Sequence, residues 1–171
     1  MEIKILSKKT CQLNRSQILE ICKLKNSYWK YGLKSNLMWF NNYTKKNDIN
    51  NLMFINSKLV GYTLLRIRTF FCGNAKKKYL YFDTFILDKN FRGKSLSSFL
   101  MNANLQSITK SKKISFLICL KNMIKYYKKF GWEILSKKKF LIRDHKSNLS
   151  GMTINNKKNN KNLKFIFYFY S

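Results

Sequence analysis

The sequence predicts an α/β fold in which about four helices flank a mixed, mostly antiparallel sheet of about seven strands. Runs of alternating or continuous apolar residues recur along the chain, and such runs are typical of strands. Other stretches place apolar residues three and four positions apart, as helices do. The 171 residues are 45% hydrophobic, so we expect a single domain over residues 1–171 with a full-sized core.

The first quarter of the chain predicts one strand and two helices. The opening MEIKILSK alternates apolar and polar residues, as a strand does. A helix then starts at Asn14, with Gln17 three residues later as in a capping box. Apolar side chains at helical spacing mark its inner face and that of a second short helix: Ile18, Ile21 and Cys22, then Leu33, Leu37 and Phe40.

Three strands follow in succession. The runs NLMFIN and LVGYTLLRIRTFF read as two strands joined at Asn56-Ser57-Lys58. Gly73 and Asn74 supply the next turn, and the strand YLYFDTFIL comes after it.

From Ser95 the pattern changes to helical spacing, and this helix can run to about Ser111. The run ISFLICL predicts a buried strand, and MIKYYKKF a brief helix that ends at Gly131. Trp132 to Leu135 starts another strand. Residues 144–162, which include NNKKNNKN, read as a loop. The tail NLKFIFYFYS predicts a last strand whose aromatic residues need a covering layer or a partner.

The formal charge of +28 is the most prominent feature of the composition. A basic chain can bind nucleic acid, a membrane surface or acidic metabolites. The excess consists of 30 Lys against 5 Arg, together with 20 Asn and no Pro, which indicates a global bias toward a few residue types. Arginine is the usual reader of base edges, so nucleic acid is not the partner that this composition favours.

The four cysteines contain no CxxC pair, and His145 is the only histidine. We therefore expect reduced thiols and no metal site. No apolar stretch is long enough to span a bilayer, and MEIKILSKK lacks the long apolar region of a signal peptide. The cytoplasm is the expected location.

Two short motifs carry the chemistry. The first, RGKSLS, follows the strand YLYFDTFIL, and the second is Tyr127 four residues before Gly131, which Trp132 follows. With the order of elements, these residues make the chain resemble the GNAT superfamily of acyl-CoA-dependent N-acyltransferases. The family turn is [Q/R]-x-x-G-x-[G/A], and serines replace its two later glycines here. The upstream Asn of the second motif would fall at Leu120, and Asn122 is the nearest candidate.

The turn motif has a physical rationale of its own. Successive backbone N–H groups that enter a helix converge on one point, and the helix dipole adds positive charge there, so a pyrophosphate can bind. The alternative is that Ser95 or Ser97 only caps the helix. The predicted CoA-binding residues of this turn are Arg92, Gly93, Lys94, Ser95, Leu96 and Ser97.

The resemblance implies acetyl-CoA as the acyl donor, with the backbone of Phe85, Ile86 and Leu87 along its pantetheine arm and thioester. Tyr127 would then protonate the departing thiolate, although a tyrosine on a short helix often only packs. Asp83 is the predicted base, because it stands two residues before Phe85 and so should face the same side. The alternatives are a purely structural Asp83, and Glu133 as the base. Cys119 is expected to pack as a small hydrophobe rather than form an acyl-enzyme.

The acceptor is predicted to be the primary amine of a small molecule. Residues 28–43 contain six aromatic residues that either contact an amino sugar, free or nucleotide-linked, or simply cover the sheet: Tyr28, Trp29, Tyr31, Trp39, Phe40 and Tyr43. Two other functions stay open. One is a basic binding module that holds RNA or another acidic partner, and the other is a protein N-acetyltransferase. The aromatic tail also makes a homodimer a reasonable expectation.

Overall fold

The computed structural model describes residues 2–155 and 164–170 of the chain. The sheet is mixed and mostly antiparallel, with four α-helices, as predicted from the sequence. Its strands follow the order β1-β2-β3-β4-β5-β8-β6, while β9 pairs with β3 and β7 pairs with β9. The parallel pairs are β4 with β5 and β7 with β9. The chain packs as two compact units, Met1–Arg66 with Asp83–Ser107 and Ile67–Phe82 with Ile108–Ser171.

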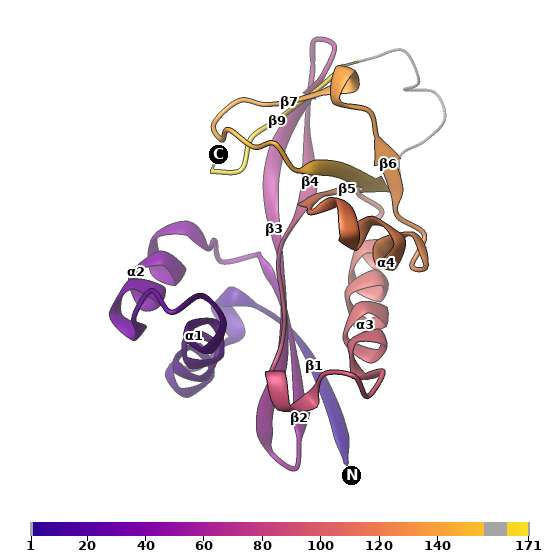
Figure 1. Cartoon of the computed structure of the whole chain (residues 1–171). Helices are drawn as coiled ribbons and strands as arrows, with labels where there is room; N and C mark the ends of the chain where they lie inside the picture. The colour runs from indigo at the N-terminus through magenta and orange to yellow at the C-terminus, as the bar shows by residue number, and fades with distance from the viewer. Residues whose placement is uncertain (1, 156–163, 171) are drawn as a thin grey trace. The chain divides into compact units, whose positions relative to one another are not determined.

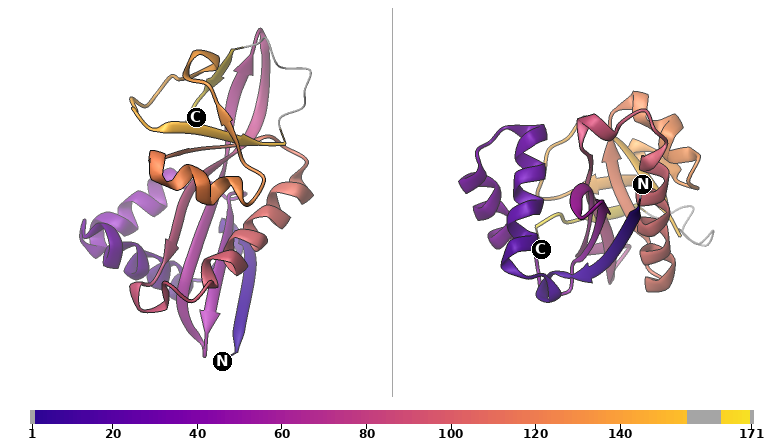
Figure 2. Two further views of the ribbon diagram at one scale, coloured as in Figure 1. Left: turned by 45° about the vertical axis from the view of Figure 1, so that its right-hand side comes forward. Right: turned by 90° about the horizontal axis from the view of Figure 1, so that it is seen from below.

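The first unit contains an antiparallel sheet with helices on both faces (Figures 1 and 2). Its elements are β1 (Ile3–Lys9), α1 (Arg15–Trp29), α2 (Leu33–Tyr43), β2 (Ile49–Ile55), the start of β3 (Lys58–Cys72), the end of β4 (Ala75–Leu87) and most of α3 (Leu96–Ser111). Helices α1 and α2 cover one face, and α3 covers the other.

Local sequence signals explain two of these boundaries. The capping box of α1 forms as predicted, because the side chain of Asn14 accepts from the Gln17 N–H at 2.8 Å and the Gln17 side chain accepts from the Asn14 N–H at 3.2 Å. The turn between β2 and β3 places Asn56 and Ser57 at φ of 47° and 66°. Two successive residues at positive φ are typical of the tight hairpin turn that suits the twist of a sheet.

The second unit is built around an aromatic core. Its elements are the rest of β3 and β4, β5 (Ser115–Cys119), α4 (Ile124–Lys128), β6 (Glu133–Leu135), β7 (Phe140–Ile142), β8 (Ser150–Ile154) and β9 (Phe165–Phe167). The rings of Phe116 and Phe167 stack at 4.0 Å, and those of Tyr81 and Phe169 at 3.9 Å. Contacts between aromatic rings stabilise the fold in addition to the apolar area that they bury.

The aromatic tail is covered within its own unit. Phe165, Phe167 and Phe169 are all buried, as their alternation predicts. Asp144 also fixes the tail, because its carboxylate accepts from the N–H groups of Phe169 and Tyr170, each at 2.8 Å. The predicted homodimer stays a prediction.

The mixed, mostly antiparallel sheet is confirmed, and the described residues form nine strands where the sequence indicates seven. The two strands that the sequence did not indicate are β7 and β8. β8 lies inside the stretch 144–162 that reads as a loop, and it pairs with both β5 and β6. Its five residues are Ser-Gly-Met-Thr-Ile, so it lacks the continuous apolar run that marks a central strand. Positions 156–162 of that stretch lie outside the described residues.

Candidate active site

The end of β4 leads into α3 through a short exposed turn in the first unit. The backbone N–H of Asp88 donates to the carbonyl of Val60 at 2.7 Å, which ties the end of β4 to β3. The carboxylate of Asp88 accepts from the Asn90 N–H at 3.0 Å and so starts the 3₁₀ turn Lys89–Phe91. Residues 92–95 then form the turn itself, and α3 begins at Leu96.

The backbone of this turn is open toward solvent. Gly93 and Ser95 have φ of 76° and 56°, and a Cβ built on Gly93 would meet no atom within 4 Å. Among the described residues, none accepts a hydrogen bond from the backbone N–H groups of residues 93–97. Five successive donors at the start of a 16-residue helix can bind phosphate oxygens. The serine in the left-handed region adopts the conformation that glycine usually supplies.

Arg92 positions the turn. Its Nε donates to the carbonyl of Leu87 at 3.1 Å, and its guanidinium lies 5.3 Å from the centre of the Tyr28 ring on α1. Arg92 therefore links the end of β4 to α1 with its own side chain. Lys94 is exposed, with its ammonium 5.9 Å from the centre of the Phe91 ring.

The three residues predicted to line the acyl donor divide between the two faces of the first unit. Ile86 is buried in the cluster that includes Ile21 and Leu24 of α1. Phe85 and Leu87 pack against the cluster that contains Leu96 and Leu100 of α3.

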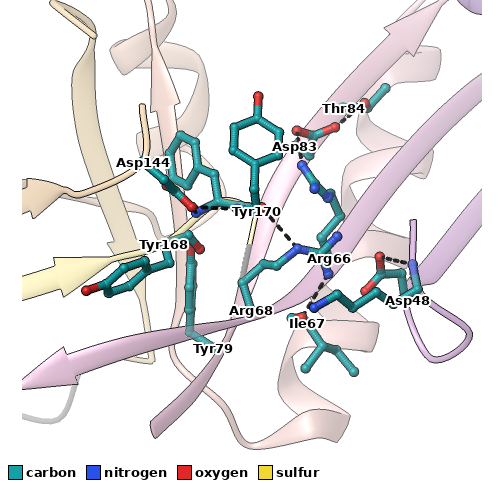
Figure 3. A network of polar contacts seen from close by, with 12 residues as sticks. Asp48, Arg66, Ile67, Arg68, Tyr79, Asp83, Thr84, Asp144, Tyr168 and Tyr170 are labelled. Atoms are coloured by element: carbon teal, nitrogen blue, oxygen red, sulfur yellow. Dashed lines mark hydrogen bonds and ion pairs between the residues drawn. The ribbon is translucent and has the colours of Figure 1, made fainter. Parts of the chain in front are cut away.

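Asp83 does not share a face with Phe85, and this expectation from the sequence is wrong. Its Oδ1 lies 3.3 Å from Nη1 of Arg66 (Figure 3). The guanidinium of Arg66 is 5.4 Å from the ring of Trp39 on α2. Asp83 and Ile86 therefore both face the α1 and α2 side, although strict alternation would put residues three apart on opposite faces. The alternation of β4 is interrupted between them.

The carboxylate of Asp83 is held at both oxygens. Arg66 approaches Oδ1, and the hydroxyl of Thr84 donates to Oδ2 at 3.0 Å (Figure 3). The side chains of Arg66 and Asp83 are 2% and 14% exposed, so solvent screens this ion pair only weakly.

Lys25 completes this cluster, although it was not predicted from the sequence as a site residue. Its ammonium lies 3.4 Å from the centre of the Trp39 ring, and the residue is 5% exposed. Burial lowers the pKa of Lys25 to about 8, while Asp83 and Cys22 raise it and Arg66 lowers it further. The signal was present, because Lys25 stands seven residues after Ile18, on the apolar stripe of α1. Arg66 likewise interrupts an apolar strand run.

Tyr127 lies on α4 in the second unit and is buried. Its ring lies 6.2 Å from that of Phe82 and 6.3 Å from that of Trp132, both edge to face, and the residue is 8% exposed. Gly131 ends this segment at φ 81°, as predicted, and the Trp132 N–H donates back to the Tyr127 carbonyl at 3.3 Å. The chain turns back at Gly131, so that Tyr127 and Trp132 pack in the same aromatic cluster.

The other candidates of the second unit differ in exposure. Asn122 and Glu133 are exposed, in the 3₁₀ turn Lys121–Met123 and in β6. Cys119 is buried with its sulfur 3.8 Å from that of Met152, and burial raises the pKa of its thiol. A protonated buried thiol is a poor nucleophile, which supports the packing role expected from the sequence.

The aromatic residues of 28–43 also differ in exposure. Phe40 belongs to the core, Trp29 and Trp39 are half-buried, and Tyr28, Tyr31 and Tyr43 are exposed. In residues 2–155 and 164–170, no group of His, Cys, Asp and Glu side chains could hold a metal ion. No helix of the same residues is long and apolar enough to cross a bilayer.

A family model described as the acetyltransferase (GNAT) family matches residues 18–132. A search of curated proteins gives no match. Among solved structures, Escherichia coli YhbS, a GNAT family N-acetyltransferase in complex with CoA, has a TM-score of 0.70 and 12% identity, covering 99% of this chain and 91% of that one. Escherichia coli ElaA has a TM-score of 0.66 and 16% identity, covering 89% and 99%. An acyl-CoA N-acyltransferase from Pseudomonas aeruginosa has a TM-score of 0.66 and 12% identity, covering 89% of this chain and 99% of that one.

Proposed function

The chain belongs to the acetyltransferase (GNAT) family, and from this premise we propose that it transfers an acetyl group from acetyl-CoA directly to the primary amine of a small molecule. The observation that carries the proposal is the open turn after β4, where five successive N–H groups have no acceptor among the described residues. These donors suit the pyrophosphate of CoA, because each can give a hydrogen bond to an anionic oxygen.

The residues of the turn would bind the donor in different ways. The backbone of residues 93–97 would hold the pyrophosphate, and the absence of atoms near Gly93 leaves room for a phosphate against the chain. Arg92 would keep the turn in place through Leu87 and Tyr28. The backbone of residues 85–87 would accompany the pantetheine arm and polarise the thioester carbonyl. Asn122 is proposed as a further contact to the cofactor.

The chemical step needs a group that accepts a proton and a group that donates one. The acceptor amine must be neutral when it attacks the thioester carbon, and the C–S bond then breaks to release a thiolate. We assign the proton donor to Tyr127, whose phenol can protonate that thiolate. Asp83 is the proposed base, and its bonds to Arg66 and Thr84 hold the carboxylate in a fixed position. Glu133, which is exposed, is the alternative base.

Calorimetric titration with acetyl-CoA tests the proposal, with nucleic-acid-free protein at near-physiological salt. We expect binding in the micromolar range that persists as salt is raised, since fixed N–H donors are screened less than surface lysines. Ser95→Glu should abolish it by placing a charge against the pyrophosphate, whereas Asn102→Glu, on the exposed face of the same helix, should not.

Two results would overturn the proposal. If wild type and Ser95→Glu bind acetyl-CoA with equal affinity, the turn does not bind the pyrophosphate. Binding that disappears with salt would instead favour the basic binding module, for which the charge of +28 is the supporting observation. If acetyl-CoA binds as expected, thiol release in an amine screen identifies the acceptor, and peptide amines belong in that screen.

A further inference from the structure

Lys25 is a buried cation whose neighbours leave its hydrogen-bond donors unused. Its ammonium faces the rings of Trp39 at 3.4 Å and Trp29 at 5.7 Å. Within the part of the chain that the structure describes, Lys25 has no ion pair and donates no hydrogen bond. An aromatic face compensates a cation only partly, and three N–H groups of an ammonium seek oxygen acceptors.

The charges around Lys25 do not balance. Arg66 from β3 and Lys25 from α1 are both cations, and Asp83 is the carboxylate that the structure places with them. Asp83 accepts from Arg66 at one oxygen and from Thr84 at the other, so one negative charge faces two cations. A buried charge without its counter-ion is costly, so a further anion would stabilise this cluster.

The cluster lies beneath side chains rather than beneath a strand. Trp39 is half-buried, and its ring is 6.0 Å from that of Tyr43, which is 43% exposed. Both belong to α2, so the ring that lies against the ammonium is itself partly open to solvent. The cluster also contains Asp83, the proposed base for the acceptor amine.

We propose that Lys25, supported by Arg66, binds an anionic oxygen group of the acceptor, a carboxylate or a phosphate, so that the substrate is an anionic primary amine. This inference rests on the proposed acetyl transfer and names its acceptor class. The ionisation of Lys25 is consistent with it, because a pKa of about 8 leaves the ammonium charged at pH 7. The charged or titratable groups that act on it are Cys22 on its own helix, Arg66 on β3 and Asp83 on β4.

Matched pairs of amines test the inference through acetyl transfer. Each pair shares a skeleton and differs by one anionic group: phenylalanine with phenethylamine, glycine with glycinamide, and O-phosphoethanolamine with ethanolamine. We expect kcat/KM for an anionic member to exceed that of its partner by about tenfold or more, as a charge-assisted hydrogen bond allows. Comparable kcat/KM for both members of every pair would overturn the inference.

Substitutions test whether Lys25 causes the higher kcat/KM for the anionic amines. Lys25→Met should remove the preference through a higher KM for the anionic member, and Lys25→Arg should restore part of it. Lys23→Met, on the exposed side of the same helix, should keep the preference. Equal losses in Lys25→Met and Lys23→Met would contradict a specific site.

A binding measurement without acetyl-CoA separates this inference from the proposed function. In an NMR titration, the signal of the Lys25 side chain is assigned by its absence in Lys25→Met. The pKa of Lys25 should rise when O-phosphoethanolamine is added, because an anion favours the charged form. A rise in the pKa of Lys25 without any acetyl transfer would support the anion site and contradict the proposed acetyltransferase function. No shift with any of the three anionic probes would overturn the anion site, whatever the enzyme does with neutral amines.

Discussion

Nη1 of Arg66 lies 3.3 Å from Oδ1 of Asp83, in a buried ion pair that joins β3 to β4 in the first unit. Removing the carboxylate leaves the guanidinium of Arg66 and the ammonium of Lys25 buried without it. Asp83→Asn should therefore lower the free energy of unfolding by about 3 kcal/mol, because an uncompensated buried charge costs more than the pair gains. Urea denaturation at pH 7 measures this.

The control is an ion pair at the surface. Lys58 and Asp88 are 3.5 Å apart, but the lysine side chain is 63% exposed. Lys58→Met should cost about 0.5 kcal/mol or less. Similar losses for Asp83→Asn and Lys58→Met would show that burial does not strengthen the pair.

Gly93 gives a test of the turn that separates affinity from stability. An added Cβ meets no protein atom within 4 Å, so Gly93→Ala should cost about 1 kcal/mol, from its φ of 76°. The same methyl group would occupy the space where a phosphate approaches the backbone. We expect the Kd for acetyl-CoA to rise by about tenfold or more, a larger free energy than the loss of stability.

The comparison uses calorimetry and urea denaturation on one preparation. Gly131→Ala serves as the control, since Gly131 also has a positive φ of 81° and lies outside the turn. It should lose stability and keep its affinity for acetyl-CoA. Equal changes of affinity in the two variants would place the pyrophosphate elsewhere.

Tyr127→Phe removes the proposed proton donor and keeps the ring. The contacts with Phe82 and Trp132 need only the aromatic body, so unfolding and the Kd for CoA should change little. We expect kcat to fall by about 100-fold, within the usual range for general acid catalysis. Steady-state kinetics with an accepted amine measures it.

Tyr126→Phe is the matched control, because it removes the neighbouring phenol of the same helix. It should retain most of kcat. A rise in the Kd of Tyr127→Phe with kcat unchanged would make Tyr127 a binding residue. Equal losses of kcat in both variants would show that the effect is not specific to the phenol of Tyr127.

The elements of the first unit could be predicted because their signals are local. The capping box at Asn14, the turn at Asn56 and Ser57, and the change of period at Ser95 each depend on residues close in sequence. The face of Asp83 could not be predicted in this way, because the interrupted alternation of β4 depends on how the strand packs. Lys25 stands on the apolar stripe of α1, but the stripe alone does not show that Trp39 and Asp83, which are distant in sequence, lie near it.

The strand β8 was missed for a different reason. Its place between β5 and β6 results from pairing with segments 35 and 18 residues away, as Met152 opposite Leu117 and Ile134 illustrates. Non-local pairing of this kind leaves little trace in a five-residue segment.

Gly151 in β8 provides a test of that packing. A Cβ at this position would lie 2.7 Å from Cε1 of Phe140 and 2.9 Å from Cε2 of Phe116. Gly151→Ala should therefore lower the free energy of unfolding by about 2 kcal/mol, because the rings must move. The double variant Gly151→Ala with Phe140→Leu should recover part of the loss. Additive losses in the double variant would show that the ring of Phe140 does not cause the clash.

The buried Lys25 predicts how stability depends on pH. Its pKa falls from 10.5 to about 8 in the folded protein, so between these values the unfolded chain binds a proton that the native state lacks. The free energy of unfolding should then rise with pH through this interval, by about 1 kcal/mol from pH 7 to pH 9. Above pH 9 the thiol of Cys22 opposes the rise, because its pKa is raised from 9.0 to about 11.

Urea denaturation at pH 7, 8 and 9 measures the free energy of unfolding of each variant. Comparing the variants cancels the contributions of the other titrating groups, which they share. Wild type and Lys23→Met should share the rise, and Lys25→Met should lack it. The same rise in Lys25→Met would assign it to another group. If the rise disappears when O-phosphoethanolamine is present, the anion holds Lys25 in its charged form, since a ligand that favours the ammonium raises its pKa toward the unfolded value. A rise that is unaffected by the anion would count against the anion site at Lys25.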